Sequence, residues 1–325
     1  MKIQLRHNFE DIVSIDNLLE AWKEFIRGKR NKKDIQEFSL RLMDNIIMLH
    51  QNLANGIYSH GGYQAFNISD PKSRNIHKAS VRDRLLHHAI YRILYPFFDK
   101  TFISDSYSCR LEKGTHKALN RFWSFAYKAS QNNTKTCWIL KCDIKKFFAN
   151  IDHKVLLGIL DLYISDKQIV WLLKEIIESF SSKPGIGLPL GNLTSQLFVN
   201  IYMNEFDQFV KHELKIKHYI RYADDFVILA DNKNYLENLI FSISKFLFEK
   251  LKLQLHPNKV SIKTLNSGID FLGWVNFPDH RVLRNTTKRR MIRRIAESPT
   301  PETLNSYLGL LKHGNTKKLK KQIGL

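Results

Sequence analysis

Two adjacent aspartates mark the part of the sequence that could carry chemistry. Asp224 and Asp225 separate two short aromatic and branched aliphatic runs, 219–222 and 226–229, whose composition is typical of strands. We therefore expect the pair at the tip of a β-hairpin. Crowding two like charges is costly unless a cation neutralises them, so the pair indicates a divalent metal site. An exposed acidic turn is the alternative that these residues leave open.

A third carboxylate ends another strand-like run, CWILKCD, at Asp143. An aspartate at the end of a strand can meet a hairpin tip in the same sheet. Carboxylate oxygens suit Mg²⁺, which keeps several waters and shares its shell with substrate phosphates. Two such ions about 3.5–4 Å apart can activate an attacking hydroxyl and stabilise a leaving oxygen. The predicted chemistry is nucleotidyl transfer.

The elements that must position these aspartates alternate along the chain and predict an α+β fold. Apolar residues at helical spacing, with Ser14 and Thr115 as candidate caps, predict helices over 15–26, 35–49, 85–97, 115–125, 153–180 and 195–214. Strand-like runs cover 137–143, 218–222, 226–230, 260–265 and 270–277. A Ser-Asp-Pro turn predicts a hairpin over 63–79. From Arg284 onward the chain is cationic and helical in pattern.

Charge and length indicate the class of partner. The 325 residues carry 51 Lys and Arg against 31 Asp and Glu, a net charge of +20. A positive field of this size attracts polyanions, and nucleic acid is the first candidate, with a merely basic solvated surface as the alternative. A 43% apolar fraction is enough to bury a sizeable interior. Because 325 residues are too many for one small core and too few for a large multi-domain protein, two or three tightly joined subdomains are expected.

Several site classes receive no support from the sequence. The three cysteines contain no Cys-x-x-Cys pair, so neither a disulfide framework nor a zinc knuckle is expected. His87 and His88 are adjacent on a predicted helix and face different directions, so packing or surface exposure is expected rather than metal binding. Without a secretion signal or an apolar run near 18 residues, the chain is expected to be soluble and cytoplasmic.

Five segments, in this order, resemble the palm of reverse transcriptases: Asp143 with Phe148 five residues later, LPLGNLTSQLF (188–198), Tyr-Ala-Asp-Asp (222–225), Lys259, and Phe-Leu-Gly-Trp (271–274). The resemblance covers nearly the whole chain and implies an RNA-directed DNA polymerase. It implies a right-hand fold with fingers over 1–100, an antiparallel-sheet palm over 101–280 that contains inserted fingers helices near 153–185, and a short helical thumb over 281–325.

The resemblance also implies the metal site and its acid. Asp143, Asp224 and Asp225 would hold two Mg²⁺ ions, for which Mn²⁺ could substitute. The backbone carbonyl of Ile144 would complete a metal shell. Lys259 would lie near the departing pyrophosphate as a general acid. Taken without the resemblance, Lys259 reads as a surface lysine.

Further residues would contact nucleotide and nucleic acid. By the resemblance, Lys72 and Arg74 at the hairpin tip would clasp the triphosphate, and Phe148 would exclude a 2′-hydroxyl from the sugar site. Without the family, these would read as a solvated turn and a core phenylalanine. The remaining implied contacts are Leu190 and Gly191 beside the nucleotide, Arg110 and Lys113 toward the template, and Gly273 and Trp274 in a hairpin that grips the primer.

One motif departs from the usual reverse transcriptase pattern, and this departure indicates a narrower group within the family. Many reverse transcriptases have Gln before the glycine of this motif and Ser-Pro after it, whereas this chain has Leu190 before Gly191 and Ser195-Gln196 after. This version resembles the enzymes of diversity-generating retroelements. Apolar Leu190 would check base-pair geometry less strictly than a hydrogen-bonding Gln, which predicts lower fidelity.

The narrower resemblance implies particular partners and an outcome. The enzyme would copy a template-repeat RNA onto a cDNA primer strand from dNTPs, with frequent errors opposite adenine, and the cDNA would replace a variable region of a target gene. A small, basic, oligomeric accessory protein would assist it. The gene would belong to a bacterium, an archaeon or a phage.

Rival interpretations remain open. A retron enzyme, a group II intron type or an abortive-infection type would share the chemistry. We expect no maturation or endonuclease domain, because only about 40 residues follow Arg284. A non-catalytic RNA-binding scaffold is the rival from another class, but all three aspartates and Lys259 are present.

Overall fold

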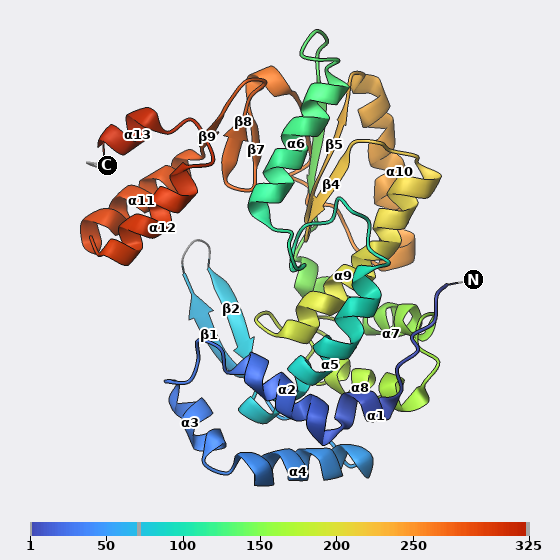
Figure 1. Cartoon of the computed structure of the whole chain (residues 1–325). Coiled ribbons are helices and arrows are strands. Elements are labelled where there is room, and N and C mark those ends of the chain that lie inside the picture. Colours follow the sequence, from blue (N-terminus) through green and yellow to red (C-terminus); the bar gives the residue numbers. More distant parts are fainter. Residues whose placement is uncertain (1, 70–72, 323–325) are drawn as a thin grey trace. The chain divides into compact units, whose positions relative to one another are not determined.

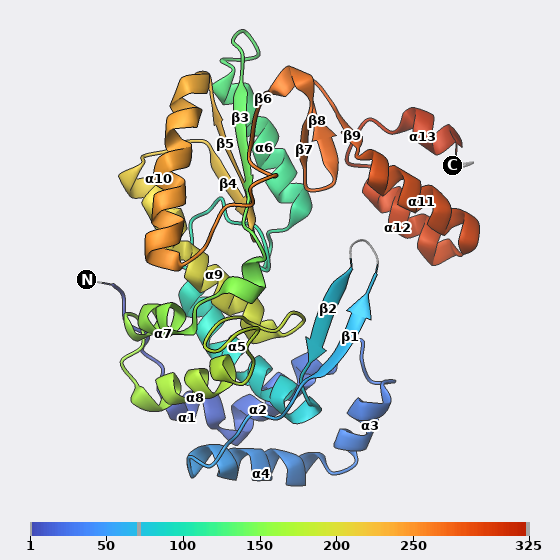
Figure 2. The same cartoon turned by 180° about the vertical axis from the view of Figure 1, so that it is seen from behind.

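Four antiparallel strands from distant parts of the sequence form one sheet in the computed structural model, which describes residues 2–69 and 73–322. The strand order is β4-β5-β3-β6, with β4 at Tyr219–Tyr222, β5 at Asp225–Ala230, β3 at Trp138–Asp143 and β6 at Ser261–Thr264. The central strands are apolar along most of their length because helices cover both faces. Figures 1 and 2 show α6 (Thr115–Ala129) and α10 (Lys233–Leu251) on opposite sides of the sheet.

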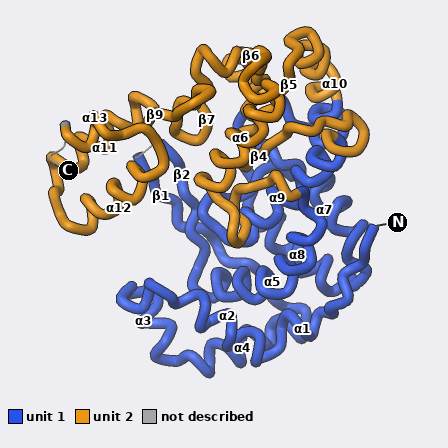
Figure 3. The backbone as a smooth tube through the Cα atoms, turned by 45° about the horizontal axis from the view of Figure 1, so that its top comes forward, with its two compact units in different colours: residues 1–103, 145–209, 246–254 blue, residues 104–144, 210–245, 255–325 orange. Residues whose placement is uncertain are grey.

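The chain divides into two units, which are coloured separately in Figure 3. Unit 1 comprises residues 1–103, 145–209 and 246–254, and unit 2 comprises residues 104–144, 210–245 and 255–325. All four strands of the sheet belong to unit 2. The division into fingers, palm and thumb stays a prediction.

Unit 2 also contains a smaller antiparallel sheet and the C-terminal helices. Its strands are β7 (Ile269–Phe271), β8 (Trp274–Asn276) and β9 (Arg281–Leu283), followed by α11 (Asn285–Glu297), α12 (Pro301–Leu311) and α13 (Lys317–Gln322). The predicted strand over 270–277 is therefore a hairpin, as the family resemblance implied. Its turn needs positive φ at Leu272 (+50°) and Gly273 (+86°). The buried face of α6, both sheets and the C-terminal helices share one apolar core.

Unit 1 is mainly helical. Its elements are α1 (Phe9–Val13), α2 (Ile15–Phe25), α3 (Lys33–Ser39), α4 (Leu42–Ala54), α5 (Val81–Asp99), the 3₁₀ turn Phe147–Asn150, α7 (His153–Asp161), α8 (Lys167–Glu178), α9 (Leu193–Gln208) and the hairpin of β1 (Gln64–Ile68) with β2 (Arg74–Lys78). Helix α5 packs against α2 and α9. Within the described ranges, no helix combines the length and apolar character needed to cross a membrane.

Local side-chain hydrogen bonds explain where the predicted helices were wrong. The helix expected over 35–49 is two helices, α3 and α4, because Ser39 Oγ donates to Ile35 O (2.7 Å) and Asn45 Nδ2 donates to Phe38 O (3.0 Å), which satisfies carbonyls at the end of α3. Thr115 is not the cap of α6. Gly114 is the N-cap, and the Thr115 hydroxyl donates to Tyr222 Oη (3.2 Å).

Of the other helix predictions, one was wrong and one is confirmed. The apolar segment 153–180 also forms two helices, α7 and α8, rather than one. The Ser14 cap of α2 is confirmed, since its side chain accepts from Asn17 N at 3.3 Å.

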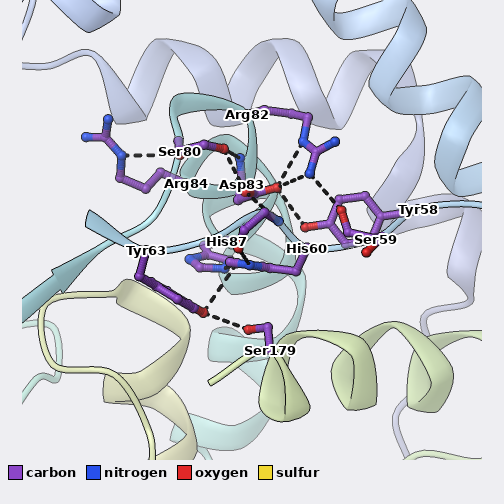
Figure 4. Close-up of polar contacts among 11 residues, drawn as sticks. Tyr58, Ser59, His60, Tyr63, Ser80, Arg82, Asp83, Arg84, His87 and Ser179 are labelled. Carbon is purple, nitrogen blue, oxygen red and sulfur yellow. Dashed lines mark hydrogen bonds and ion pairs between the residues drawn. The ribbon is translucent and has the colours of Figure 1, made fainter. Parts of the chain in front are cut away.

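Both roots of the β1–β2 hairpin are attached to one buried carboxylate, Asp83 (Figure 4). Before β1, Tyr58 Oη donates to Asp83 Oδ1 (3.0 Å) and Gly61 N donates to Oδ2 (3.1 Å). After β2, Ser80 Oγ donates to Oδ2 (2.6 Å), and the Arg82 guanidinium donates twice to Oδ1 (3.0 and 2.8 Å). A buried carboxylate is stable only when its lone pairs are satisfied in this way, so Asp83 fixes the base of the hairpin.

A histidine pair continues this network (Figure 4). His60 Nδ1 lies 2.6 Å from Gly61 O, a pure acceptor, so Nδ1 carries the hydrogen and Nε2 is left as an acceptor. His87 Nε2, at 3.1 Å, then donates to His60 Nε2. A proton on His60 Nε2 would set two donors against each other. Burial lowers the pKa of His60, and burial together with His60 lowers the pKa of His87 to about 3. His87 is thus a packing residue, as expected.

We expect the histidine pair to make folding stability depend on pH. The pKa of His87 is 6.5 in an ordinary environment and about 3 in the fold, so below pH 6.5 the unfolded chain binds more protons. Stability is present above pH 6.5 and is lost as pH falls toward 3. In urea unfolding, His87 should account for up to about 2 kcal/mol of stability lost between pH 7.5 and pH 5.0, and the neighbouring His88, whose pKa is lowered to about 4, should account for a similar share. His87→Gln should reduce the loss of stability by the His87 share, leaving the His88 share in place, and the exposed control His7→Gln should leave the loss unchanged, whereas an unchanged pH dependence in His87→Gln would contradict the assignment.

Candidate active site

The structure brings the three predicted aspartates to one end of the larger sheet. Strands β3 and β5 pair so that Asp143 lies directly opposite Asp225. Strands β4 and β5 form a hairpin whose flanking pair is Tyr222 and Asp225, so Asp224 lies in the turn. The backbone N–H of Ile144 donates to Asp224 O at 3.3 Å, which attaches the end of β3 to that turn. Three carboxylates from two chain segments therefore share one small region.

A buried arginine shapes the turn that carries Asp224. Ala223 has φ of +56°, a left-handed conformation that costs a non-glycine residue about 1–2 kcal/mol. Arg221, fully buried on β4, donates from Nη1 to Ala223 O (3.2 Å) and from Nη2 to Ser106 Oγ (3.1 Å). These bonds hold the Ala223 carbonyl in place. The strained turn is thus supported from inside the fold.

Asp143 has a cationic partner. Lys259 Nζ lies 3.0 Å from both carboxylate oxygens of Asp143. The backbone supports this pair, since His256 N donates to Asp143 O (2.7 Å) and Lys259 N donates to His256 O (3.1 Å). The Asp143 side chain is nearly buried, whereas that of Lys259 is 46% exposed. The ammonium group can therefore reach both the carboxylate and solvent.

Crowding alters the charge of the turn aspartate. Burial, followed by the nearby charges of Asp225 and Asp143, raises the pKa of Asp224 to about 6, and Lys259 opposes this effect. The ionised form of Asp224 is therefore less favoured than that of a free aspartate, although it still predominates at neutral pH. A cation at this end of the sheet would relieve the repulsion.

The donor chemistry suits a hard divalent cation. Carboxylate oxygens are preferred ligands of Mg²⁺, and such a site usually also uses water and substrate phosphates. Among residues 2–69 and 73–322, no three His, Cys, Asp or Glu side chains form a metal-binding cluster by themselves. Asp143, Asp224 and Asp225 thus provide a partial donor set, and Lys259 occupies part of it.

In unit 1, the glycine motif packs against the hairpin. His77 N on β2 donates to Leu190 O (3.0 Å), and Asn192 Nδ2 donates to His77 O (2.8 Å). Gly191 has φ of +103°, and a Cβ there would lie 2.7 Å from Ile76 Cγ2. Only glycine allows this close approach. Leu190 is half-buried beside the strand.

Three further residues of unit 1 are candidates for nucleotide contact: Arg74, Lys72 and Phe148. Arg74 is exposed at the first position of β2, paired with Ile68. Lys72 lies outside the described residues. Phe148 is half-buried and packs edge to face on Phe147, with ring centroids 5.6 Å apart.

Four residues predicted to contact template or primer belong to unit 2. Arg110 Nη1 donates to Ser106 O (3.0 Å) and Lys113 Nζ donates to Ser104 O (2.8 Å), so both hold their own loop. Gly273 forms the β7–β8 turn. Trp274 is 1% exposed, so its indole is a core group and any primer contact there would involve backbone.

Sequence reasoning missed two residues that shape this molecule. Arg221 interrupts the strand run HYIRY with a charge, and that isolated charge was a usable signal of a buried structural role. Asp83 lies in a helical pattern beside Arg82, where its burial was not evident. The partners of both residues come together only when the chain folds.

Comparisons with known proteins point to one family. A profile of the family described as reverse transcriptase (RNA-dependent DNA polymerase) matches residues 69–275. Protein YkfC of Escherichia coli (strain K12) is 25% identical over 276 residues, covering 73% of this chain and 70% of YkfC. The group II intron-encoded protein LtrA of Lactococcus lactis subsp. cremoris is 24% identical over 318 residues, covering 76% of this chain.

The intron-encoded relatives are longer than the matched region. The match spans about half of LtrA (51%). It spans 22% of the putative COX1/OXI3 intron 1 protein of Saccharomyces cerevisiae, which is 26% identical over 192 residues. The family profile, however, covers more than half of the present chain and includes every strand of the aspartate-bearing sheet. This chain therefore belongs to the reverse transcriptase family.

Proposed function

We propose that this chain is an RNA-directed DNA polymerase that extends a primer by nucleotidyl transfer at Asp143, Asp224 and Asp225. The observation that carries the proposal is the β3–β5 register, in which Asp143 faces Asp225 beside the turn aspartate. Membership in the reverse transcriptase family supports the same reaction. Template RNA, a cDNA primer strand and dNTPs are then the partners.

The three aspartates and the carbonyl of Ile144 would hold two Mg²⁺ ions, with Mn²⁺ as a substitute. When bound, these ions would activate the primer hydroxyl and stabilise the leaving oxygen of the triphosphate. The sheet's contribution is orientation, since the ladder fixes Asp143 and Asp225 at one height. Lys259, beside Asp143, would donate the proton that the leaving pyrophosphate needs.

The proposed substrate contacts are those that the resemblance to reverse transcriptases implies. Lys72 and Arg74 would bind the triphosphate, Phe148 would exclude ribonucleotides, and Leu190 with Gly191 would lie beside the nascent pair. Arg110 and Lys113 would face the template. The hairpin turn at Gly273 and Trp274 would support the primer through its backbone. Exposure of Arg74 supports its part in this assignment.

We further propose that the enzyme is mutagenic and belongs to a diversity-generating retroelement, where it copies a template-repeat RNA with a small basic accessory protein. The half-buried Leu190, an apolar residue before Gly191, supports lower fidelity. A group II intron type is the second candidate, favoured by the similarity to LtrA. A retron or abortive-infection enzyme would use the same carboxylates.

The carboxylates are tested by primer extension on an RNA template with Mg²⁺. Asp224→Asn and Asp225→Asn should each lower the extension rate at least about a hundredfold, because each removes a charge from a site that stabilises the transition state. Asp161→Asn, an exposed substitution at the end of α7, should extend like the parent. Equal extension by all three variants would refute the carboxylate assignment, and no extension by the parent chain would leave it as a non-catalytic RNA-binding scaffold.

Two substitutions at Lys259 separate proton donation from charge neutralisation. Lys259→Ala should lower the single-turnover rate about 10²-fold or more, and Lys259→Arg should not restore it, because a guanidinium does not release its proton. Rapid-quench measurement of one nucleotide addition gives the rate. Recovery by the arginine variant would show that only the positive charge beside Asp143 matters.

The mutagenic role is tested at Leu190. Sequencing cDNA made from the cognate RNA should show errors concentrated opposite template adenines, and Leu190→Gln should reduce them because the amide can hydrogen-bond near the new base pair. Leu162→Gln, on an exposed leucine in unit 1, is the matched control and should keep the parental spectrum. An unchanged spectrum in Leu190→Gln would remove this residue from the account, and accurate copying by the parent would favour the group II intron type.

A further inference from the structure

Unit 2 contains a cavity of about 380 Å³ that the polymerase reaction does not use. Its lining includes Lys128 at the end of α6, Lys215, Lys217 and His218 before β4, Asp231 after β5, and Tyr235 in the first turn of α10. A volume of this size lies within the range of small-ligand sites. All of these residues lie in unit 2.

The cavity and the carboxylates lie at opposite ends of β5. The strand begins at Asp225, while Leu229 and Ala230 at its other end line the cavity. Five residue steps at about 3.3 Å each separate the two ends by about 17 Å. A ligand bound in the cavity would therefore be distinct from a nucleotide at the aspartates.

The charges around the cavity attract an anion. Three lysines converge on it, and the pKa of His218 is lowered by burial and then by the charges of Lys128, Lys211 and Lys217. The loop that carries two of the lining lysines is held in a defined shape. Lys211 Nζ donates to Ile216 O (3.3 Å) and Lys217 O (3.0 Å). Lys215 takes the left-handed φ of +53°.

Two further lining residues distinguish a nucleotide from a bare anion. The Asp231 carboxylate repels inorganic phosphate but accepts hydrogen bonds from ribose hydroxyls, as acidic residues do in dinucleotide sites. Tyr235 is 42% exposed and presents an aromatic face on which a base can stack. Its backbone N–H donates to Asn232 Oδ1 (3.0 Å), which orders the start of α10.

We propose that this cavity binds a nucleotide, with its phosphate at the lysines, its ribose at Asp231 and its base at Tyr235. The nucleotide can be free or can be one residue of an RNA strand, since the chemistry of recognition is the same. The site needs neither the carboxylates of Asp143, Asp224 and Asp225 nor a metal ion. It is therefore independent of the proposed polymerase function.

Isothermal titration of the full chain in EDTA tests this site, with AMP, dAMP, pyrophosphate and a five-nucleotide RNA as probes. AMP should bind saturably and more tightly than dAMP or pyrophosphate. Lys217→Ala and Tyr235→Ala should each weaken AMP about tenfold, through a lost charge-assisted contact and a lost stacking contact. Asp231→Ala should weaken AMP and tighten pyrophosphate, an opposite change that misfolding would not produce.

Two controls make the result decisive. Lys167→Ala removes an exposed lysine from α8 in unit 1 and should bind AMP like the parent. Asp225→Asn should also keep AMP binding, although it is expected to lower primer extension at least about a hundredfold. Tighter binding of AMP than of the RNA would identify a free nucleotide as the ligand, and the reverse would identify a strand. No saturable binding of either, parental affinity in all three cavity variants, or loss of binding in Asp225→Asn would overturn the proposal.

Discussion

The β3–β5 ladder forces Asp143 and Asp225 to face each other, and the chemistry of this chain depends on that enforced repulsion. Like charges directly opposite on a sheet cost up to about 1 kcal/mol, and burial increases the cost. Each buried aliphatic or aromatic side chain of these strands contributes about 1.5–3 kcal/mol. Leu140, Phe226 and Ile228 are fully buried, so packing determines the register and the aspartates must accept it.

This order of energies makes the aspartates a preformed site. The ladder holds the backbones of Asp143 and Asp225 opposite each other, and Lys259, which contacts Asp143, offsets the repulsion only in part. Burial, followed by the remaining repulsion, raises the pKa of Asp224. Because the fold already holds these groups together, a divalent cation would bind without first having to bring them together, which is what preorganisation means. The buried Arg221 contributes by holding the Ala223 carbonyl of the turn.

The sequence was informative where structure depends on near neighbours. The Ser14 cap, the hairpin before α5 and the strand ending in Asp143 were predictable because period, cap and turn residues lie within a few positions. The break between α3 and α4 was not, because Asn45 reaches back to a carbonyl inside an unbroken apolar pattern. The pair of Lys259 with Asp143 joins residues 116 positions apart and needed the fold.

The two ends of β5 are surrounded by different charged residues. One end gathers carboxylates and the other gathers the lysines around the cavity beside Ala230. At physiological ionic strength charges are screened beyond about 8 Å, and the two ends are about 17 Å apart. The lysines therefore cannot neutralise the aspartates, although the chain carries a net charge of +20. The end of β5 that carries the aspartates therefore still favours binding of a cation, because the length of the strand separates it from the lysines at the other end.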